Sequence, residues 1–440
     1  YIDNEGFSEE VTTSEKIIYF TSNGITANGE SGNDLLTGSK NNDTLKGLGG
    51  SDEIQGGDGN DTIEGGDGAD TLNGGDGNDT IKGGDGVDVI RGGDGDDTLN
   101  DDGDSTIYGE GGNDTISPTN TESGRAAGLK VYGGDGNDTI SGPTFHTVEA
   151  GAGDDTVTLS SGQPSQVPSV ISGGDGNDKL IFGWYGWNGI SIDWTAVTGF
   201  EEINLTSGNG GGYSTDFTDN VGQAGTTLKI ISGGSYSVDF DFSAESNASI
   251  DINSDYSSDS SSTSNDIFIG GALADTIKSL AGNDTVKGNG GNDTLDLGTG
   301  DDIVTGGAGN DTIDGGLGTD IAIFSGNQEN YSITTSVSGL YETITISGTD
   351  GTDTLTNIET LRFDDGDLDV RLAGRTIKDS GQGIFSPITG DPIVGGTLTV
   401  GSISGDPDGT NSSPNITYQW QKISSSSWAD ISGATSSTYS

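Results

Sequence analysis

Five consecutive nonapeptides decide the fold of this chain: GGDGNDTIE (56–64), GGDGADTLN (65–73), GGDGNDTIK (74–82), GGDGVDVIR (83–91) and GGDGDDTLN (92–100). Each unit joins a glycine-rich half, which tolerates positive φ, to a short half that suits a β-strand. The strand half places one aliphatic residue at its eighth position, as in Ile63 and Leu72. A fixed short period of this kind predicts stacked repeats, because low-complexity linkers do not keep register over so many units.

Copies of the same unit occur on both sides of this run. They are GESGNDLLT (29–37), GSKNNDTLK (38–46), GLGGSDEIQ (47–55), GEGGNDTIS (109–117), GGDGNDTIS (133–141), AGAGDDTVT (150–158) and GGDGNDKLI (173–181), and a second block spans 261–323. Two units close one coil, and stacked backbones lie about 4.8 Å apart. We therefore expect a parallel β-solenoid, in which the insertions at 118–132 and 159–172 either loop out or break the stack.

The composition excludes several classes of protein. The 440 residues contain 16 Lys and Arg against 70 Asp and Glu, a formal net charge of −54, and 80 glycines. This acidity argues against nucleic-acid partners, and no apolar run is long enough for a membrane span. There is no cysteine, so disulfides and thiolate metal sites are excluded. A chain that is only 28% hydrophobic is expected to be disordered unless bound cations help it to fold.

The sixth residue of each unit is the candidate metal ligand. An ion midway between two layers lies about 2.4 Å from oxygens above and below, which suits Ca²⁺ better than Mg²⁺. Third-position acids either contribute a main-chain carbonyl or face solvent. The expected carboxylate ligands are Asp52, Asp61, Asp70, Asp79, Asp88, Asp97, Asp114, Asp138, Asp155, Asp178, Asp275, Asp284, Asp293, Asp302, Asp311 and Asp320. The expected carbonyl ligands are those of Gly56, Asp58, Gly65, Asp67, Gly74, Asp76, Gly83, Asp85, Gly306 and Ala308.

Some turns depart from the pattern and are weaker candidates. Glu30-Ser31 and Ser39-Lys40-Asn41 replace turn glycines before Asp34 and Asp43, and Leu273 and Ser279-Leu280 interrupt the second block. We expect roughly a dozen bound Ca²⁺ ions in all, and which of the interrupted turns hold one stays open.

The units match G-G-x-G-x-D-x-U-x, so the chain resembles the RTX (repeats-in-toxin, haemolysin-type) calcium-binding repeat proteins of the large bacterial surface and secreted type. The resemblance covers well over a third of the chain and implies a calcium-loaded parallel β-roll or β-helix with the same ligands. It also implies type I secretion to an extracellular, cell-surface location. Extracellular calcium modules work at about 10⁻⁴–10⁻³ M, so we expect the chain to fold only after export.

The composition shifts along the chain predict six segments. They are an N-terminal strand or cap (1–28), a first RTX block with insertions (29–181), a wider-coil β-helix (182–260), a second RTX block (261–323), a β-rich cap (324–383) and part of an immunoglobulin-like sandwich (384–440). Tyr1 is no initiator and the last residues stop in mid-pattern, so we expect both termini to be cut.

Two functions fit these features. The first is a calcium-dependent extracellular structural or adhesive protein: a surface rod, surface-layer subunit or filament. The alternative is the secretion and folding module of a larger secreted enzyme or toxin whose catalytic domain lies outside this chain. We expect no enzyme activity in the chain itself, because His146 is the only histidine and no catalytic motif can be assembled.

The partners beyond calcium stay open between self-association and a cell-surface glycan. The aromatic group Trp184, Tyr185, Trp187 and Trp194 suits either sugar stacking or packing where the repeat changes shape, and we favour packing.

Overall fold

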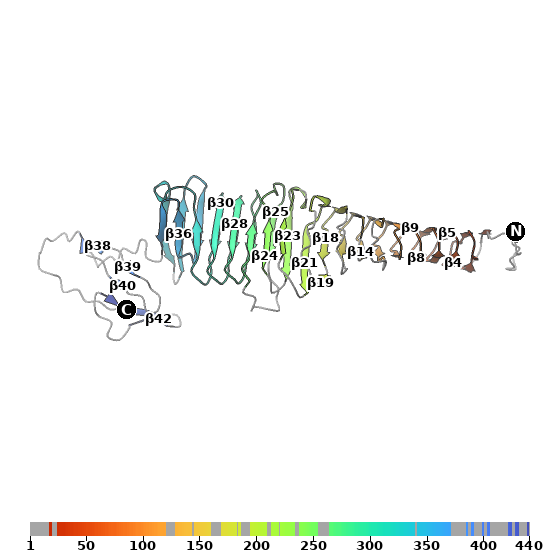
Figure 1. The fold of residues 1–440 in the computed structure, drawn as a ribbon, viewed down its shortest axis with the longest axis horizontal. Helices are drawn as coiled ribbons and strands as arrows, with labels where there is room; N and C mark the ends of the chain where they lie inside the picture. The colour runs from red at the N-terminus through yellow and green to blue at the C-terminus, as the bar shows by residue number, and fades with distance from the viewer. Residues whose placement is uncertain are drawn as a thin grey trace.

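Parallel strands follow one another along nearly the whole described chain. The computed structural model describes residues 17–19, 24–119, 128–142, 145–159, 169–182, 184–185, 194–208, 213–219, 221–233, 237–253, 264–338 and 341–370, and the short strands within 384–439 named below. These residues form strands and two single 3₁₀ turns, η1 (Trp194–Ala196) and η2 (Gln328–Asn330), and no α-helix occurs among them. The fold is all-β, a parallel solenoid drawn out into a rod whose strands run across its long axis (Figure 1).

Two sheets form the sides of the N-terminal half, because successive nonapeptides alternate between them. The first sheet contains β1 (Ile17–Tyr19), β3 (Leu35–Thr37), β5 (Glu53–Asp58), β7 (Thr71–Asp76), β9 (Val89–Asp94), β11 (Thr106–Gly111), β13 (Lys130–Asp135), β15 (Thr147–Ala152), β17 (Val170–Asp175) and β20 (Val197–Thr198). The register is that of the repeat: Ile54 lies beside Leu72, and Leu72 beside Ile90.

The second sheet runs through both repeat blocks and the segment between them. It contains β2 (Thr26–Asn28), β4 (Thr44–Gly49), β6 (Thr62–Asp67), β8 (Thr80–Asp85), β10 (Thr98–Asn100), β12 (Thr115–Ile116), β14 (Thr139–Gly142), β16 (Thr156–Leu159), β18 (Lys179–Phe182), β21 (Glu202–Gly208), β23 (Thr227–Gly233), β25 (Ser249–Asn253), β27 (Thr276–Lys278), β29 (Thr294–Asp296) and β31 (Thr312–Asp314). The short β19 (Trp184–Tyr185) also pairs with β21. Because this sheet is continuous, the blocks form one rod.

A third sheet replaces the first in the C-terminal half. It contains β22 (Tyr213–Asp216), β24 (Val238–Asp241), β26 (Ile267–Ile269), β28 (Thr285–Gly290), β30 (Ile303–Ala308), β32 (Ile321–Ile323), β36 (Thr360–Phe363) and β37 (Gly366–Asp369). The insertions do not break the stack, since β11 pairs with β13, and β15 pairs with β17, in parallel register.

The core is a line of aliphatic side chains between the sheets. The eighth-position residues Leu45, Ile54, Ile63 and Leu72 are at most 1% exposed, and the residues on either side of each face outward, as alternation along a strand requires. In the wider coils between the blocks, aromatic residues fill the larger interior. Phe217 stacks on Phe242, with ring centroids 3.9 Å apart.

Antiparallel strands close the C-terminal end of the rod. β35 (Thr352–Thr356) continues the second sheet in parallel beside β31, and β34 (Tyr341–Ser347) and β33 (Ser332–Ser338) then fold back on it. β36 and β37 form the matching hairpin on the third sheet. These hairpins cover the strand edges that the last coil would otherwise expose.

The chain beyond residue 370 is described only as short strands. β38 (Ile384–Phe385) pairs antiparallel with β41 (Ile403–Ser404); β39 (Thr389–Gly390), β40 (Leu398–Thr399) and β44 (Thr438–Tyr439) form one small sheet; β42 (Gln421–Ser424) pairs with β43 (Ser427–Asp430). The remainder of the expected immunoglobulin-like domain, and most of the N-terminal cap at 1–28, lie outside the described residues. The six segment boundaries stay a prediction.

Candidate metal centre

The sixth-position aspartates form columns along the edges of the rod. Oδ1 of Asp61 accepts a 2.7 Å hydrogen bond from the main-chain N–H of Asp43, and Oδ1 of Asp79 accepts one of the same length from Asp61. Asp97 continues the series by accepting from Asp79. These carboxylates are almost fully buried, with Asp61 2% and Asp79 1% exposed. One carboxylate oxygen of each residue therefore ties two layers together.

The second carboxylate oxygen, Oδ2, is buried without a hydrogen-bond partner in most of these turns. We call such turns open. They belong to Asp52, Asp61, Asp70, Asp79, Asp88, Asp97, Asp114, Asp138, Asp155, Asp178, Asp284, Asp293, Asp302, Asp311 and Asp320. A buried acceptor without a partner costs free energy, about 1–3 kcal/mol for a neutral group and more for a charge. A cation would remove this cost.

In most open turns the first residue is a glycine, which leaves room beside that oxygen; Ala150, Ser279 and Leu297 stand there in the turns of Asp155, Asp284 and Asp302. A Cβ atom built on Gly56 would come within 3.0 Å of both Asp61 Oδ2 and the main-chain oxygen of Gly74 in the next layer. The same convergence occurs at Gly74, between Asp79 Oδ2 and the oxygen of Gly92. The strand ladder passes from Gln55 to Gly57 and omits Gly56. A side chain in place of Gly56 or Gly74 would therefore fill the space between these two oxygens.

The backbone at the second position distinguishes open turns from closed ones. In every open turn this residue has a positive φ, +117° at Gly57 and +81° even at Leu48. Glu30, Ser39 and Gly271 have no positive φ. Their main-chain N–H groups instead donate to Oδ2 of Asp34, Asp43 and Asp275, at 2.6, 2.5 and 2.7 Å. We call these three turns closed, because the protein itself satisfies the carboxylate.

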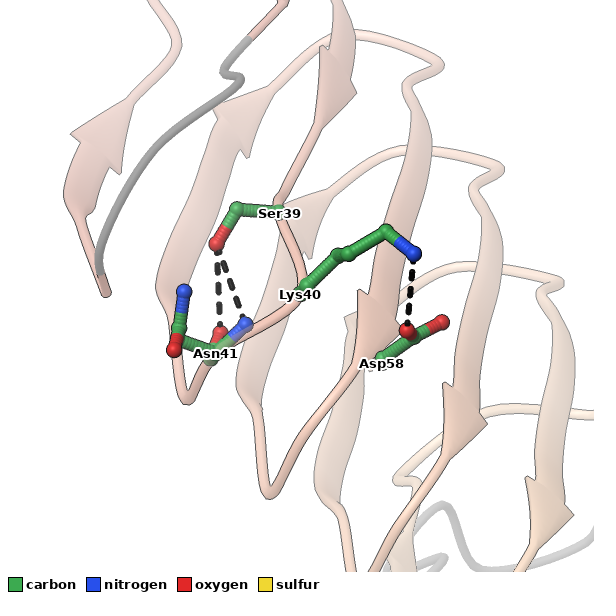
Figure 2. Close-up of polar contacts among 4 residues, drawn as sticks. All are labelled: Ser39, Lys40, Asn41 and Asp58. Carbon is green, nitrogen blue, oxygen red and sulfur yellow. Dashed lines mark hydrogen bonds and ion pairs between the residues drawn. The ribbon is translucent and has the colours of Figure 1, made fainter.

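Figure 2 shows Ser39, Lys40 and Asn41, which belong to the closed turn of Asp43, together with Asp58. The Ser39 hydroxyl accepts a 3.2 Å hydrogen bond from the Asn41 N–H, and Lys40 Nζ lies 3.6 Å from Oδ2 of Asp58 in the next layer (Figure 2). Lys40 is 87% exposed, so the ion pair is worth at most about 1 kcal/mol. The side chains that replace glycine here complete the turn with protein contacts alone.

The electrostatics of the column aspartates in open turns favour a bound cation. Burial, with the carboxylates of Asp79 and Asp43 nearby, raises the pKa of Asp61 from 3.8 to about 7. Burial, with Asp114 and Asp79 nearby, likewise raises the pKa of Asp97 to about 7. The hydrogen bond from the neighbouring layer lowers each pKa and only partly offsets burial. Column carboxylates therefore disfavour their ionised form unless positive charge is bound.

The donor set of an open turn is made of hard oxygens. Within the described residues no group of three or more His, Cys, Asp or Glu gathers to hold a metal. Most open turns with a glycine at the first position instead pair one carboxylate oxygen with a main-chain oxygen of the next layer, a set typical of Ca²⁺ sites. The residues present thus fit Ca²⁺, with sixth-position carboxylates and first-position carbonyls as the groups that would hold it.

The expected carbonyl ligands differ in their surroundings. The oxygen of Gly74 lies at the convergence point beside Gly56, and that of Gly83 lies at the corresponding point beside Gly65. The third-position oxygens of Asp67, Asp76 and Asp85 accept hydrogen bonds from the N–H groups of Gly50, Gly59 and Gly68 in the preceding layer. Ala308 accepts from Gly291 in the same way. Third-position oxygens therefore already hold the layers together, and their role as ligands stays a prediction.

Sequence reasoning missed several column residues. Glu201 and Glu359 end two columns by accepting the N–H groups of Asp178 and Asp320, each at 2.7 Å. Asp266 and Asp353 also belong to the columns, through Oδ1 contacts with the N–H groups of Val238 and Asp311. In all four cases a buried aliphatic or aromatic residue stands two positions after the acid. This acid–x–apolar spacing could have identified them from the sequence.

One edge of the first block loses its carboxylates after Asp88. Beside the first sheet, the positions after Asp88 are held by Ser105, Leu129, His146 and Ser169, and main-chain hydrogen bonds still join their layers. The Ser105 hydroxyl also accepts from the Asp88 N–H, and Ser169 Oγ lies 3.4 Å from His146 Nε2. The opposite edge keeps its aspartates as far as Asp178. His146 lies there beside Thr147, 3.1 Å from its hydroxyl.

The aromatic group of the wider coils is partly accounted for by packing. Trp194 is 2% exposed and lies 4.3 Å from Phe217 and 6.0 Å from Phe182, measured between ring centroids. Trp184 and Tyr185 form β19, but their side chains, like Trp187, lie outside the described residues. Packing is thus confirmed for Trp194 and stays a prediction for the others.

The fold and these columns define a class of protein: a parallel β-roll whose edges carry buried carboxylates for hard divalent cations. The family model of the RTX calcium-binding nonapeptide repeat matches residues 28–63, 64–99, 101–118, 130–142, 169–184, 261–295, 269–304 and 287–322. The chain therefore carries RTX repeats in several copies, and its repeats bind Ca²⁺. Such repeat proteins are typically secreted by type I systems, which supports an extracellular location.

Two further comparisons add little to this identification. No curated protein matches the chain. Among solved structures, the extracellular lipase LipA from Serratia marcescens is similar over 41% of this chain and 33% of that chain, at 20% identity and a TM-score of 0.13. This chain thus spans about a third of the lipase, and a likeness this weak carries no argument. In the described part of the chain, no helix has the length and apolar character of a membrane span.

Proposed function

We propose that this chain is a calcium-dependent extracellular structural or adhesive protein that folds into a rigid rod when it binds Ca²⁺ after secretion. The observation that carries the proposal is the second sheet, whose strands stack without interruption from β2 to β35. Beside it, open turns occur in both repeat blocks, from Asp52 to Asp320. A continuous stack with cations between its layers is a stiff spacer.

Secretion explains why folding depends on calcium. A chain whose buried carboxylates repel one another stays unfolded where Ca²⁺ is scarce and folds where it reaches about 10⁻⁴–10⁻³ M. No catalytic step is part of this proposal. The finer role is that of a surface rod, surface-layer subunit or filament. Its partner is another copy of the chain or a cell-surface glycan; Trp194, being buried, takes no part in glycan stacking.

Electron microscopy of the native protein at its source, with Ca²⁺ and after chelation, tests this role. We expect rods or arrays at the cell surface that disperse when Ca²⁺ is removed. The contrary result is a released, monomeric product whose reading frame also encodes a catalytic domain. It would instead support the alternative of a secretion and folding module for a larger enzyme or toxin.

A further inference from the structure

The open turn of Asp88 lies beside a repeat unit that is one residue shorter than the others in its run. After Asn100 the repeat continues as DDGDSTIY (101–108), eight residues in place of nine. The strands nevertheless stay in register, with Thr106 beside Val89 and Ile107 beside Ile90. Counting back from this register, Ser105 stands at the sixth position. Counting forward from Asn100, the ninth residue of the preceding unit, Asp101 stands at the first position, so the missing residue lies between the two.

Ser105 and Asp101 together provide what a sixth-position aspartate provides elsewhere: an acceptor for the N–H of the preceding layer and an unsatisfied carboxylate oxygen. The Ser105 hydroxyl accepts a 2.7 Å hydrogen bond from the Asp88 N–H, as a sixth-position Oδ1 does elsewhere. Asp101 is 0% exposed; its Oδ2 accepts a 2.8 Å hydrogen bond from the Gly103 N–H, and its Oδ1 has no partner. A fully buried carboxylate with one unsatisfied oxygen has thus moved into the place of a glycine.

This unsatisfied oxygen points at the open turn of Asp88. A Cβ atom built on Gly83 would come within 3.0 Å of both Asp101 Oδ1 and Asp88 Oδ2. At Gly65 and Gly74 the same point is shared by one carboxylate oxygen and one main-chain oxygen, that of Gly83 or Gly92. The shortened coil therefore replaces a neutral carbonyl donor with a second carboxylate.

We propose that Asp88 and Asp101 form a two-carboxylate divalent-cation site beside Gly83, distinct from the regular turns and tighter than they are. Two full negative charges on one ion increase affinity, because ligand charge tunes Ca²⁺ binding. The site lies at the end of its column, since Ser105, Leu129, His146 and Ser169 follow on that edge. It is suited to fill first and to hold the end of the column in place. The inference rests on the calcium binding of the proposed function but not on its structural role.

Calorimetric titration of the whole chain with Ca²⁺ alone tests the site, using Asp101→Asn and a matched control, Asp102→Asn. The amide oxygen that D101N introduces can still accept from the Gly103 N–H but supplies no charge, and Asp102 is the adjacent acid, only part-buried. We expect one binding step about tenfold tighter than the rest, absent in D101N and retained in D102N. A second variant, Asp101→Gly, restores the residue type found at Gly56 and Gly65 and therefore serves as the test if D101N fails to fold. It is expected to lose the same binding step.

Calcium binding by D101N and D101G that equals that of the unaltered chain would overturn the proposal and leave the two carboxylates sharing a proton instead. Far-UV circular dichroism of the same samples separates this outcome from failure of the proposed function. Strand signal that needs no Ca²⁺ contradicts calcium-dependent folding, whereas loss of the tight step alone concerns only Asp101.

Discussion

The main-chain N–H of Asp61 donates a 2.7 Å hydrogen bond to Oδ1 of Asp79, 18 residues further along the chain, while Oδ2 of Asp79 is buried without a partner. The same carboxylate therefore fastens one layer to the next and presents an unsatisfied oxygen to the edge of the rod. Because neighbouring turns repeat this relationship, layer stacking and cation binding depend on the same residues.

Substitution of one column aspartate is expected to cost both an ion and stability. Asp79→Asn keeps an oxygen that can accept from Asp61 but removes the charge. We expect the calcium-loaded protein to lose about 1–3 kcal/mol in its free energy of unfolding, measured by denaturant melts with saturating Ca²⁺. Asp76→Asn is the control, because Asp76 is exposed and holds the layers through its main chain. Equal losses in both variants would refute a special role for the sixth position.

A methyl group at Gly56 is expected to block the ion in the turn of Asp61. In Gly56→Ala the new Cβ collides with Asp61 Oδ2 and the Gly74 oxygen, which we expect to cost about 1–3 kcal/mol and to lower the number of bound ions. Gly49→Ala is the matched control, since its Cβ would meet the nearest atoms of Asp67 at an ordinary 3.7 Å. Calcium titration and thermal melts check both. Normal calcium binding by G56A would count against the site geometry.

Closed turns are expected to hold no ion of their own. Because Asp43 Oδ2 already accepts from the Ser39 N–H, Asp43→Asn should leave the calcium stoichiometry unchanged, whereas Asp61→Asn should lower it. Ion counting by calorimetry or by metal analysis after gel filtration compares the two. A lower count in D43N would show that the closed turn opens when Ca²⁺ is present.

Calcium-depleted protein is expected to gain stability on acidification. Burial raises the pKa of Asp61 from 3.8 to about 7 and that of Asp79 to about 6, so the folded metal-free state holds protons that the unfolded chain releases. Its stability is therefore fully present below about pH 4 and is lost as the pH rises through 6 to 7. Far-UV circular dichroism of depleted protein at pH 4 and pH 7.5 measures this. More strand at pH 7.5 than at pH 4 would contradict it.

The fold was largely accessible from the sequence because the repeat is short and nearly exact. Ile63 and Leu72 lie on opposite sheets of the roll, as two units per coil require. The change from the first sheet to the third was not predictable. It falls in the wider coils, where Trp194, Phe217 and Phe242 pack together, and no nonapeptide pattern marks those residues.

The candidate site was accessible wherever the glycine pattern was intact. Of the expected carboxylates, Asp275 alone lies in a closed turn, because the Gly271 N–H donates to it; glycine at the second position does not oblige a positive φ. Leu48 shows the reverse, with a positive φ and an open turn in spite of its side chain. The sequence pattern did not predict Asp101 as a ligand, because a single missing residue moves it out of the register of the repeat.

Far-UV circular dichroism of the whole chain across a calcium titration tests the central claim most directly. We predict a disordered spectrum in chelator and a cooperative gain of strand signal as Ca²⁺ rises into the range of about 10⁻⁴–10⁻³ M, reversed when chelator is added again. A full strand spectrum that persists in excess chelator at neutral pH would contradict the account, since the open carboxylates would then need no cation.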